Sequence, residues 1–558
     1  MEQSILNKFN EWLDSPLLNE KEKAELASIK DDAKEIIERF YRELEFGTGG
    51  LRGVMALGTN RMNRFIIAKA TQGLANYVLS KYKNPSVAIG HDSRNNSDSF
   101  SKVAAAVLAA NGIKVYIYPE LMPTPAVSFA VRYLKCSSGI VVTASHNPKQ
   151  YNGYKVYGDD GCQCTIEAAD AIYAEIQKID VFKDVKYGDF DELVKTNKIE
   201  IIGNDIFEAY MASTLKQSIY KEEKILKAVY TPLYGAGRKC VTTALARDGF
   251  DVHVVKEQEN PNGDFPTCPY PNPEIHDALK LGIEQLLNEN ADILIATDPD
   301  SDRIGVVVNQ NGAPKILTGN EVGLLLFDTI YHARKDSLKK PGVLVKTIVS
   351  TDMANVMARD WGVEVREVLT GFKYIGEQIL FLEQDNEKER YLLGFEESCG
   401  YLTNTDVRDK DAVNASLLVM EMANHLKHSG LTLVDRLNQL YAKYGSFTTG
   451  LLTYEFQGVE GAQKIKDLMK AFRDEKIGEA IPNIDHVGDY LTGEIKYANK
   501  VEPTNLPASD VVKFFLKDSE TITIRPSGTE PKLKAYIFAK SNDSLEAHKK
   551  RINDFILK

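Results

Sequence analysis

The sequence predicts an α/β protein with three α/β units, whose sheets are mixed and largely parallel, followed by a C-terminal α+β domain. Two observations support this fold class. Between residues 87 and 401, short β-branched apolar runs typical of buried strands alternate with segments whose apolar residues recur at helical spacing. After Gly445 the pattern changes to closely spaced strands and one closing helix. The alternation implies parallel strands joined by helices, and the change of pattern indicates a separate domain.

The length of the chain requires several hydrophobic cores. A chain of 558 residues is too long for one core, because domains of about 100–200 residues are the norm. Combining this prior with the changes of pattern, we predict four domains, with limits at 1–205, 206–318, 319–444 and 445–558.

Charge and cysteine usage exclude several classes of function. The net charge of -11 argues against a general nucleic-acid binder. No apolar run approaches the roughly 20 residues that a bilayer requires, so we expect no membrane partner. The first residues lack the pattern of a secretory signal. Of six scattered cysteines only Cys162 and Cys164 are close, which favours reduced thiols and a cytoplasmic location.

Two segments precede the first predicted strand. Residues 19–45 are rich in charge and carry apolar residues at helical spacing, which predicts a surface helix lying against the first domain. Residues 46–53 contain four glycines around Arg52. This stretch predicts a flexible loop, which is either a plain linker or a loop that brings an arginine to an anion.

The first unit leads to a loop that contains Ser145. This residue follows the apolar run that ends at Val142, and Asn147-Pro148 prevents a helix there. Open α/β sheets bind ligands in such loops, although a lone serine is more often a turn residue. His146 is adjacent, but a G-x-S-x-G elbow is missing, which disfavours a hydrolase triad. The unit's expected strands are 87–89, 115–117 and 139–142, and its helices are 100–110 and 125–134.

The second unit leads to three alternating carboxylates, Asp298, Asp300 and Asp302. Carboxylates this close repel one another unless a cation binds them or water solvates them, and all-oxygen ligands favour magnesium or calcium. A calcium EF-hand is excluded because Arg303 and Asn309 replace its glycine and glutamate. A solvated acidic turn is the alternative. The expected strands are 228–230, 252–255 and 293–296, and the helices are 238–247 and 274–287.

The third unit leads to Glu396-Glu397-Ser398, whose carboxylates can accept hydrogen bonds from sugar hydroxyls or form an exposed acidic turn. The segment 408–411 that follows is compatible with a solvated helix start, with Asp411 near the N-terminus. The expected strands are 343–345, 363–365 and 391–393, and the helices are 321–332, 353–361 and one that begins at 370–373.

The C-terminal domain is predicted to contain strands at 447–454, 511–516, 521–525 and 534–539 and a helix at 544–556. Its segment 525–534 combines a guanidinium fork, two hydroxyls, a glycine and two lysines. These groups can hold a phosphate, although Ser-Gly-Thr is also ordinary turn chemistry.

The four motifs occur in order across about 400 residues, and together they resemble the α-D-phosphohexomutase family of phosphoglucomutases and phosphomannomutases. The resemblance covers essentially the whole chain and implies four domains around a central cleft. It implies that Ser145 is a phosphoserine, and that Asp298, Asp300 and Asp302 bind one Mg²⁺ together with an oxygen of that phosphoserine.

The resemblance also assigns the remaining candidate residues. Residues expected near the transferring phosphate or in catalysis are Arg52, His146, Lys155, Arg303 and Lys410. Residues expected to bind the sugar or the phosphate that does not react are Lys373, Glu396, Ser398, Arg525, Ser527, Gly528, Thr529 and Lys534.

The implied activity is an isomerase reaction on a sugar phosphate. Phospho-Ser145 would donate to a sugar monophosphate, a 1,6-bisphosphate would form and serve as primer, and its other phosphate would return to Ser145. Phe395 and the segment 46–52 resemble a longer subgroup that also contains phosphopentomutases. We therefore expect interconversion of glucose 1-phosphate and glucose 6-phosphate first, with mannose and pentose phosphates as alternatives, in a monomer or dimer.

Two competing hypotheses belong to other classes. A sugar-phosphate-binding scaffold without catalysis is opposed by the presence of every reactive position. A haloacid-dehalogenase-type phosphatase would also place D-x-D after an apolar strand, with Asp298 as the phosphorylated group and Asp300 as the general acid. That family usually has threonine or valine where Asp302 stands, and it would leave Thr143–Pro148 without a role.

Overall fold

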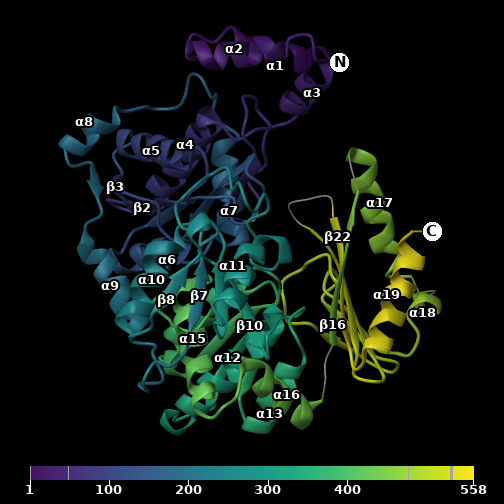
Figure 1. Ribbon diagram of the computed structural model, residues 1–558. Coiled ribbons are helices and arrows are strands. Elements are labelled where there is room, and N and C mark those ends of the chain that lie inside the picture. Colours follow the sequence, from purple (N-terminus) through teal and green to yellow (C-terminus); the bar gives the residue numbers. More distant parts are fainter. Residues whose placement is uncertain are drawn as a thin grey trace.

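The computed structural model describes residues 2–47, 49–445, 448–456, 458–474, 477–527 and 532–557. Its strands form four sheets, one within each predicted domain (Figure 1). The sheets confirm three α/β units followed by an α+β domain. The exact domain limits at 205, 318 and 444 stay predictions.

The first sheet has six strands in the order β1-β5-β4-β2-β3-β6. Strands β4, β2, β3 and β6 are parallel to one another, whereas β5 is antiparallel to both β4 and β1. The strands are β1 (Gly50–Val54), β2 (Ser86–His91), β3 (Lys114–Ile117), β4 (Ser138–Val142), β5 (Tyr151–Tyr157) and β6 (Ile199–Ile201). The helices are α1 (Gln3–Leu13), α2 (Glu20–Ser28), α3 (Ala33–Phe40), α4 (Arg64–Lys81), α5 (Ser97–Ala110), α6 (Thr124–Tyr133), α7 (Ile166–Ile176) and α8 (Phe190–Lys195).

Two expectations for the N-terminal segment were wrong. Residues 19–45 form two helices, because the Asp32 side chain accepts from the N–H groups of Lys34 and Glu35 and so begins α3 as a new helix. The glycine-rich stretch is also not a flexible loop throughout. Its second half is strand β1, in which Arg52 pairs with Gly153 of β5, so the arginine is held on a sheet.

The second and third units are smaller mixed sheets. The second has the order β11-β10-β9-β7-β8, and the third has the order β13-β12-β14-β15. The second contains α9 (Asn204–Leu215), β7 (Ala228–Thr231), α10 (Gly237–Arg247), β8 (Val252–Val254), α11 (His276–Asn288), β9 (Ile293–Thr297), β10 (Ile304–Gln310) and β11 (Ala313–Leu317). The third contains α12 (Gly319–Arg334), β12 (Val343–Thr347), α13 (Met353–Trp361), β13 (Glu364–Val368), α14 (Phe372–Gln384), β14 (Tyr391–Glu396), β15 (Gly400–Leu402), α15 (Ala412–His428) and α16 (Leu433–Tyr444).

The C-terminal domain is a seven-stranded antiparallel sheet in the order β16-β22-β21-β20-β17-β18-β19. Its helices lie on the side away from the other domains (Figure 1). The elements are β16 (Thr448–Glu455), α17 (Gly458–Ala471), α18 (Ile477–Ala480), β17 (Ile484–Asp489), β18 (Glu494–Lys496), β19 (Val501–Pro503), β20 (Val512–Leu516), β21 (Thr521–Pro526), β22 (Lys532–Ala539) and α19 (Asn542–Ile556).

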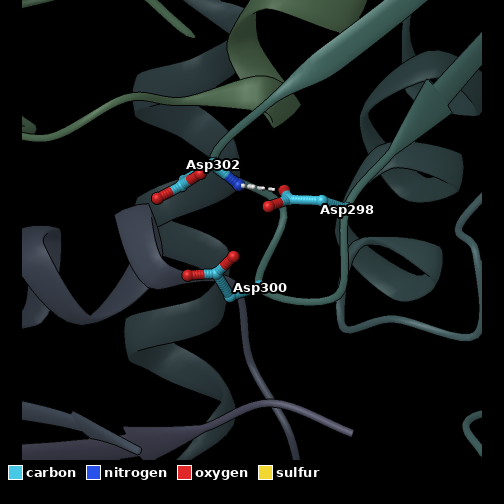
Figure 2. Close-up of side chains that lie close together, drawn as sticks. All are labelled: Asp298, Asp300 and Asp302. Atoms are coloured by element: carbon cyan, nitrogen blue, oxygen red, sulfur yellow. Dashed lines mark hydrogen bonds between the residues drawn. The ribbon is translucent and has the colours of Figure 1, made fainter. Parts of the chain in front are cut away.

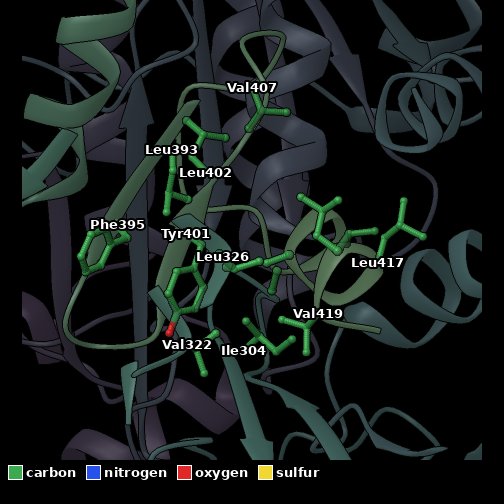
Figure 3. Packing of buried hydrophobic residues seen from close by; sticks show 14 of the residues in the cluster. Ile304, Val322, Leu326, Leu393, Phe395, Tyr401, Leu402, Val407, Leu417 and Val419 are labelled. Atoms are coloured by element: carbon green, nitrogen blue, oxygen red, sulfur yellow. The ribbon is translucent and has the colours of Figure 1, made fainter. Parts of the chain in front are cut away.

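The hydrophobic core is divided unequally among the units. One cluster of buried side chains runs through the first three units, and Figure 3 shows the part where Ile304, Val322, Phe395 and Tyr401 meet. The C-terminal domain has a separate core between its sheet and helices α17 and α19, which includes Phe514. In the part of the chain that the structure describes, no helix is long and apolar enough to cross a membrane.

Candidate active site

Ser145 lies directly after β4, at the carboxyl end of a buried strand, as predicted. Its backbone has φ +51, a left-handed conformation that is uncommon for residues other than glycine, asparagine and aspartate. The side chain is almost fully buried, and its Oγ donates to Asp298 Oδ2 at 2.8 Å and lies 3.1 Å from His146 Nδ1. The hydroxyl is therefore fixed against the carboxylates of the second unit rather than exposed in a turn.

Arg94 holds the Ser145 loop from behind. Its fully buried guanidinium donates to the main-chain carbonyls of Ser145, Asn147, Pro148 and Tyr151. Four carbonyls around one cation fix the course of the loop, and a left-handed serine requires such support.

Asp92, directly after strand β2, supports the same loop. It accepts from the hydroxyl of Thr143 at 2.6 Å, and its carboxylate lies 3.3 Å from Arg94 Nε. Thr143 in turn accepts from the N–H of Ser145 at 2.8 Å. The chain of contacts connects the buried carboxylate after β2 to the backbone of Ser145.

Asp298, Asp300 and Asp302 converge after β9, with carboxylate oxygens of all three within 4.8 Å of one another (Figure 2). The turn is closed by Asp298 Oδ1, which accepts from the N–H groups of Asp302 at 3.1 Å and Arg303 at 3.0 Å. All three are buried, so a solvated acidic turn is not what this motif forms.

Cations and a hydroxyl surround the three carboxylates. Lys155 Nζ on β5 donates to Asp300 Oδ2 at 2.7 Å and to Asp302 Oδ2 at 3.1 Å, and Lys410 Nζ lies 3.2 Å from Asp302 Oδ2. At the N-terminus of α6, the Thr124 hydroxyl donates to Asp300 Oδ2, and its N–H donates to the Asp300 carbonyl, each at 2.8 Å. The first unit therefore orients a residue of the second.

The carboxyl groups differ in their affinity for protons. Burial and the two neighbouring aspartates raise the pKa of Asp298 well above its ordinary value. Burial also opposes ionisation of Asp302, but the ammonium groups of Lys155 and Lys410 outweigh it and lower the pKa of Asp302. The three carboxylates thus disfavour one another's ionisation, and cations beside them relieve the repulsion.

The donor set fits a hard divalent cation. Asp300 Oδ1 and Asp302 Oδ1 are buried and have no hydrogen-bond partner among the described residues. A buried carboxylate oxygen without a partner is costly, and a metal ion would satisfy both. Carboxylate oxygens with a serine or phosphoserine oxygen beside them are the ligands that Mg²⁺ and Ca²⁺ prefer.

A cleft of about 900 Å³ opens in front of this cluster. Its walls come from all four units, and they contain nine of the predicted site residues: Arg52, His146, Arg303, Lys373, Glu396, Ser398, Arg525, Ser527 and Lys534. Ser145, Lys410 and the three aspartates are buried behind the wall, and Lys155 is partly exposed beside them. Ser145 reaches the wall through its contact with His146. The structure thus brings these predicted residues together around one space.

Two arginines of the cleft wall are oriented by polar neighbours. Arg303 Nη1 donates to Glu274 Oε1 at 2.8 Å, and Arg52 Nη1 donates to Asn147 Oδ1 at 3.0 Å. Both lie near His146, whose pKa is held well below its ordinary value by burial and then by these two cations. The wall is therefore strongly electropositive here, which suits an anionic ligand.

The loop after β14 lines the opposite side of the cleft. Glu396 is buried and accepts from the N–H of Gly371 at 2.8 Å, whereas Glu397 and Ser398 are partly exposed. Cys399 ends this loop with φ +60. Burial and the neighbouring Glu396 raise the pKa of Glu397 to about 7.

The C-terminal domain contributes paired cations to the cleft. Arg525 of β21 lies opposite Lys534 of β22 in the antiparallel ladder, and Ser527 follows β21. Gly528 and Thr529, which were predicted to complete this phosphate loop, lie outside the described residues.

The segment 408–411 is not a solvated helix start. Arg408, Asp409 and Asp411 are all buried, and Asp411 caps α15 by accepting from the N–H of Asn414. Asp409 accepts from the hydroxyl of Tyr157 at 2.7 Å and contacts Lys410 Nζ at 3.3 Å. It therefore orients the lysine that contacts Asp302.

Sequence reasoning missed several residues that hold the site, namely Asp92, Arg94, Thr124, Glu274, Asp409 and Gln163, whose side-chain amide donates to Asp409 Oδ2 at 3.0 Å. One signal for the first two was available, since His91-Asp92-Ser93-Arg94 follows the predicted strand at 87–89 in the same way that Thr143–Pro148 follows its strand. The other four lack a local signal and depend on contacts between distant segments.

Comparisons with known proteins agree with this geometry. Models of the phosphoglucomutase/phosphomannomutase alpha/beta/alpha domains I, II and III match residues 43–182, 208–312 and 318–444, and the C-terminal domain of that family matches residues 460–555. A phosphoglucomutase from Staphylococcus saprophyticus is 36% identical over 505 residues, which are 89% of this chain and 90% of the relative.

Two solved structures share the fold. A phosphoglucomutase/phosphomannomutase family protein from Burkholderia thailandensis superposes with a TM-score of 0.67 and 18% identity, covering 92% of this chain and 96% of the other. The phosphoglucomutase pp63/parafusin from Paramecium, in an open form, gives a TM-score of 0.69 and 18% identity, with the same coverage. All four domains thus have counterparts of known architecture.

Proposed function

The chain belongs to the phosphoglucomutase/phosphomannomutase family, as its motifs predicted, and from this premise we propose that it interconverts glucose 1-phosphate and glucose 6-phosphate. One observation carries the proposal. The Ser145 hydroxyl contacts Asp298 at 2.8 Å at one side of a cleft whose other side presents Arg525 and Lys534. A mutase that moves phosphate between two positions of one sugar needs these two phosphate sites.

Ser145 is the proposed phosphoryl carrier. In the forward transfer a sugar hydroxyl attacks the phosphorus of phospho-Ser145, the bond from phosphorus to Ser145 Oγ breaks, and the hydroxyl proton ends on Oγ. In the return transfer Ser145 Oγ attacks the other phosphate of the bound 1,6-bisphosphate, and the proton passes back to the sugar oxygen. Asp92 and Arg94 keep Oγ in place through both transfers, because they fix the loop backbone.

Asp298, Asp300 and Asp302 are the proposed ligands of one Mg²⁺. When bound, the ion neutralises charge on the transferring phosphoryl group. Thr124 and Lys155 orient Asp300, while Lys155 and Lys410 contact Asp302, so the carboxylates are set before the substrate arrives. Arg52 and Arg303 line the cleft beside Ser145 and present guanidinium groups to the same phosphate.

The other wall is proposed to recognise the sugar and the second phosphate. Glu396 and Ser398 offer acceptors and a hydroxyl to the sugar ring, and Lys373 lies at the start of α14 beside them. Arg525, Ser527 and Lys534 offer two cations and a hydroxyl to the phosphate that does not react. Glucose is preferred over mannose and pentose because the Staphylococcus saprophyticus relative, which is 36% identical over 89% of this chain, is a phosphoglucomutase.

The test is a side-by-side assay of the purified protein with Mg²⁺ and a glucose 1,6-bisphosphate primer. We expect conversion of glucose 1-phosphate to exceed that of the 1-phosphates of mannose, ribose and deoxyribose. A higher rate with the 1-phosphate of mannose or of a pentose would show that glucose phosphate is not the preferred substrate. Binding without any isomerisation would favour a scaffold.

A labelling experiment separates the mutase from an aspartyl phosphatase. The protein is labelled with radioactive sugar bisphosphate, denatured and treated with neutral hydroxylamine. We expect the label to survive on the peptide that contains Ser145, because a serine phosphate is an ester. Release of the label would assign an acyl phosphate to Asp298 instead. A cytoplasmic location and a monomeric or dimeric state stay predictions.

A further inference from the structure

The C-terminal domain contacts the third unit through an apolar cluster, in which Ile348 and Leu369 meet Tyr490 and Tyr536, and through a polar cluster. The polar cluster is centred on Asp352, in the segment between β12 and α13. From the C-terminal domain, Lys513 Nζ donates to both carboxylate oxygens of Asp352 at 3.4 Å, and the Thr521 hydroxyl donates to Oδ2 at 3.4 Å. From the third unit, Lys346 Nζ donates to Oδ1 at 3.1 Å. One carboxylate therefore joins groups of two domains.

The charged groups of this cluster are buried, so each of them depends on its partners within the cluster. Lys346 and Lys513 are both fully buried, and a second carboxylate, Glu367, lies 2.8 Å from Lys346 Nζ. Burial opposes ionisation of Asp352, but Lys513 and Lys346 outweigh it and hold its pKa below the ordinary value. A buried ammonium that loses its carboxylate is left uncompensated, so the cluster favours the relative position of the two domains in which Lys513 contacts Asp352.

In the third unit the cluster is continuous with the sugar-binding loop. Lys346 Nζ also donates to the Ser350 carbonyl at 3.1 Å, and the hydroxyls of Ser350 and Thr347 lie 2.9 Å apart. Thr347 then donates to Glu397 Oε2 at 3.3 Å. Displacement of the segment 347–352 would therefore displace Glu397, which lies between Glu396 and Ser398.

In the C-terminal domain the cluster is continuous with the phosphate-binding strands. Thr521, which contacts Asp352, begins the strand β21 that carries Arg525 four residues later. Lys513 lies on the neighbouring strand β20, opposite Thr523. Because paired strands move as one unit, the position of Arg525 in the cleft follows the position of Thr521 and Lys513.

We propose that Asp352 is a positioning residue for substrate binding, because its docking of the C-terminal domain sets the separation of the sugar loop and the Arg525–Lys534 pair across the cleft. The inference rests on the proposed function, since a sugar phosphate must reach both walls at once. Loss of the docking should weaken the binding of ligands that contact both walls of the cleft. It should leave Ser145 and the three aspartates unaffected, because the C-terminal domain does not hold them in place.

The test compares three variants with the complete wild-type chain. Lys513→Met removes the cross-domain ammonium and leaves the pair of Lys346 and Asp352 intact, so it is expected to fold. Asp352→Asn removes the shared charge. The matched control is Asp328→Asn, which breaks a carboxylate pair with Arg436 (2.8 Å to each oxygen) inside the third unit.

We expect the KM for glucose 1-phosphate to rise about tenfold in Lys513→Met and Asp352→Asn, with kcat within about threefold of wild type. Affinity for Mn²⁺, measured by electron paramagnetic resonance as a probe of the aspartate cluster, should not change in either variant. In Asp328→Asn the KM should remain at the wild-type value even if the melting temperature falls.

A distance measurement tests the docking without any need for turnover. Spin labels on cysteines introduced at Glu389 and Asn499, which are both exposed, report the separation of the two domains, and the six native cysteines are all buried. We expect the distance distribution to broaden or shift in Lys513→Met and Asp352→Asn but not in Asp328→Asn. A wild-type distribution and KM in both docking variants would overturn the inference, as would an equal rise of KM in the control. A wild type that does not isomerise glucose 1-phosphate would refute the proposed function instead, while the distances would still decide the docking.

Discussion

The two proposed phosphate sites of this protein are built in different ways. The Ser145 site lies where the first and second units meet, and both units belong to a hydrophobic cluster that extends through the third. Its side chains are buried and bound to one another, with contacts such as that of Thr124 to Asp300 crossing between units. The Arg525 site lies on a domain with a separate core. A polar cluster at Asp352 and a small apolar cluster that includes Ile348 and Tyr536 connect this domain to the third unit.

This difference has a chemical reason. Phosphoryl transfer requires the attacking and leaving oxygens to be held in line, so groups around the reacting phosphate gain from rigid placement. The non-reacting phosphate only has to be held, and in the proposed cycle it is the 6-phosphate in one half and the 1-phosphate in the other. A separately folded domain can offer the same cations to both without disturbing the reacting centre. The following predictions test this division.

The largest effect is expected from Ser145→Ala. Loss of the carrier oxygen should lower turnover at least about 100-fold, because a positioned nucleophile contributes at least that much. The melting temperature should change little, and Ser99→Ala, at an exposed position of α5, should keep full activity. Steady-state assays with the bisphosphate primer measure both. Residual activity above about one percent would place the carrier elsewhere.

Asp300→Asn should weaken divalent-cation binding by about tenfold or more, since it removes one anionic ligand of a buried cluster. Titration with Mn²⁺ followed by magnetic resonance gives the affinity directly. The control Asp360→Asn alters an exposed carboxylate that is paired with Lys443 and should bind the metal normally. An unchanged affinity in Asp300→Asn would exclude it as a ligand.

Arg525→Ala should raise the KM for glucose 1-phosphate about tenfold with a smaller effect on kcat, because the arginine is assigned to the phosphate that does not react. Phosphorylation of Ser145 by saturating bisphosphate should reach the wild-type level. Arg238→Ala, in which an exposed arginine loses its pair with Glu259, serves as control. Equal losses in KM and in Ser145 phosphorylation rate would move Arg525 to the reacting phosphate.

The smallest effect is expected from the pH dependence of stability. Burial and Glu396 raise the pKa of Glu397 from 4.5 to about 7, so between these values the folded protein holds a proton that the unfolded chain has lost. The free energy of unfolding of the wild type, relative to that of Glu397→Gln, should therefore fall by about 1–2 kcal/mol as pH rises from 4.5 to 7. This energy is smaller than the full pKa shift would give, because water in the cleft screens the charge. Urea unfolding at several pH values measures it, with Glu389→Gln as control. A difference that is independent of pH would contradict the raised pKa.

Local sequence determined the elements that present the reactive groups. An apolar run followed by polar residues placed Ser145, Asp298 and Glu396 at strand ends, and the structure has each of them there. The signal exists because a buried strand must be apolar and the residues after it are free to be polar. The capping aspartate Asp32 was an equally local signal, and it explains why one expected helix is two.

Some helices left no readable pattern. Helices α4 and α15 are buried on nearly all sides, so their apolar residues do not follow one face and helical spacing does not reveal them. No helix was expected over α4, and of α15 only a start at 408–411 was given, as one of two interpretations of that segment. Their position was decided by packing between layers, which requires the complete fold.

Tertiary structure alone decided how the site is held. Arg94 contacts a loop about 50 residues away, Thr124 contacts Asp300 from another unit, and Lys513 reaches Asp352 from another domain. A single sequence records each of these as one ordinary polar residue. Reactive groups are specified by local chemistry, which a motif preserves, whereas their orientation depends on contacts between segments that only folding brings together.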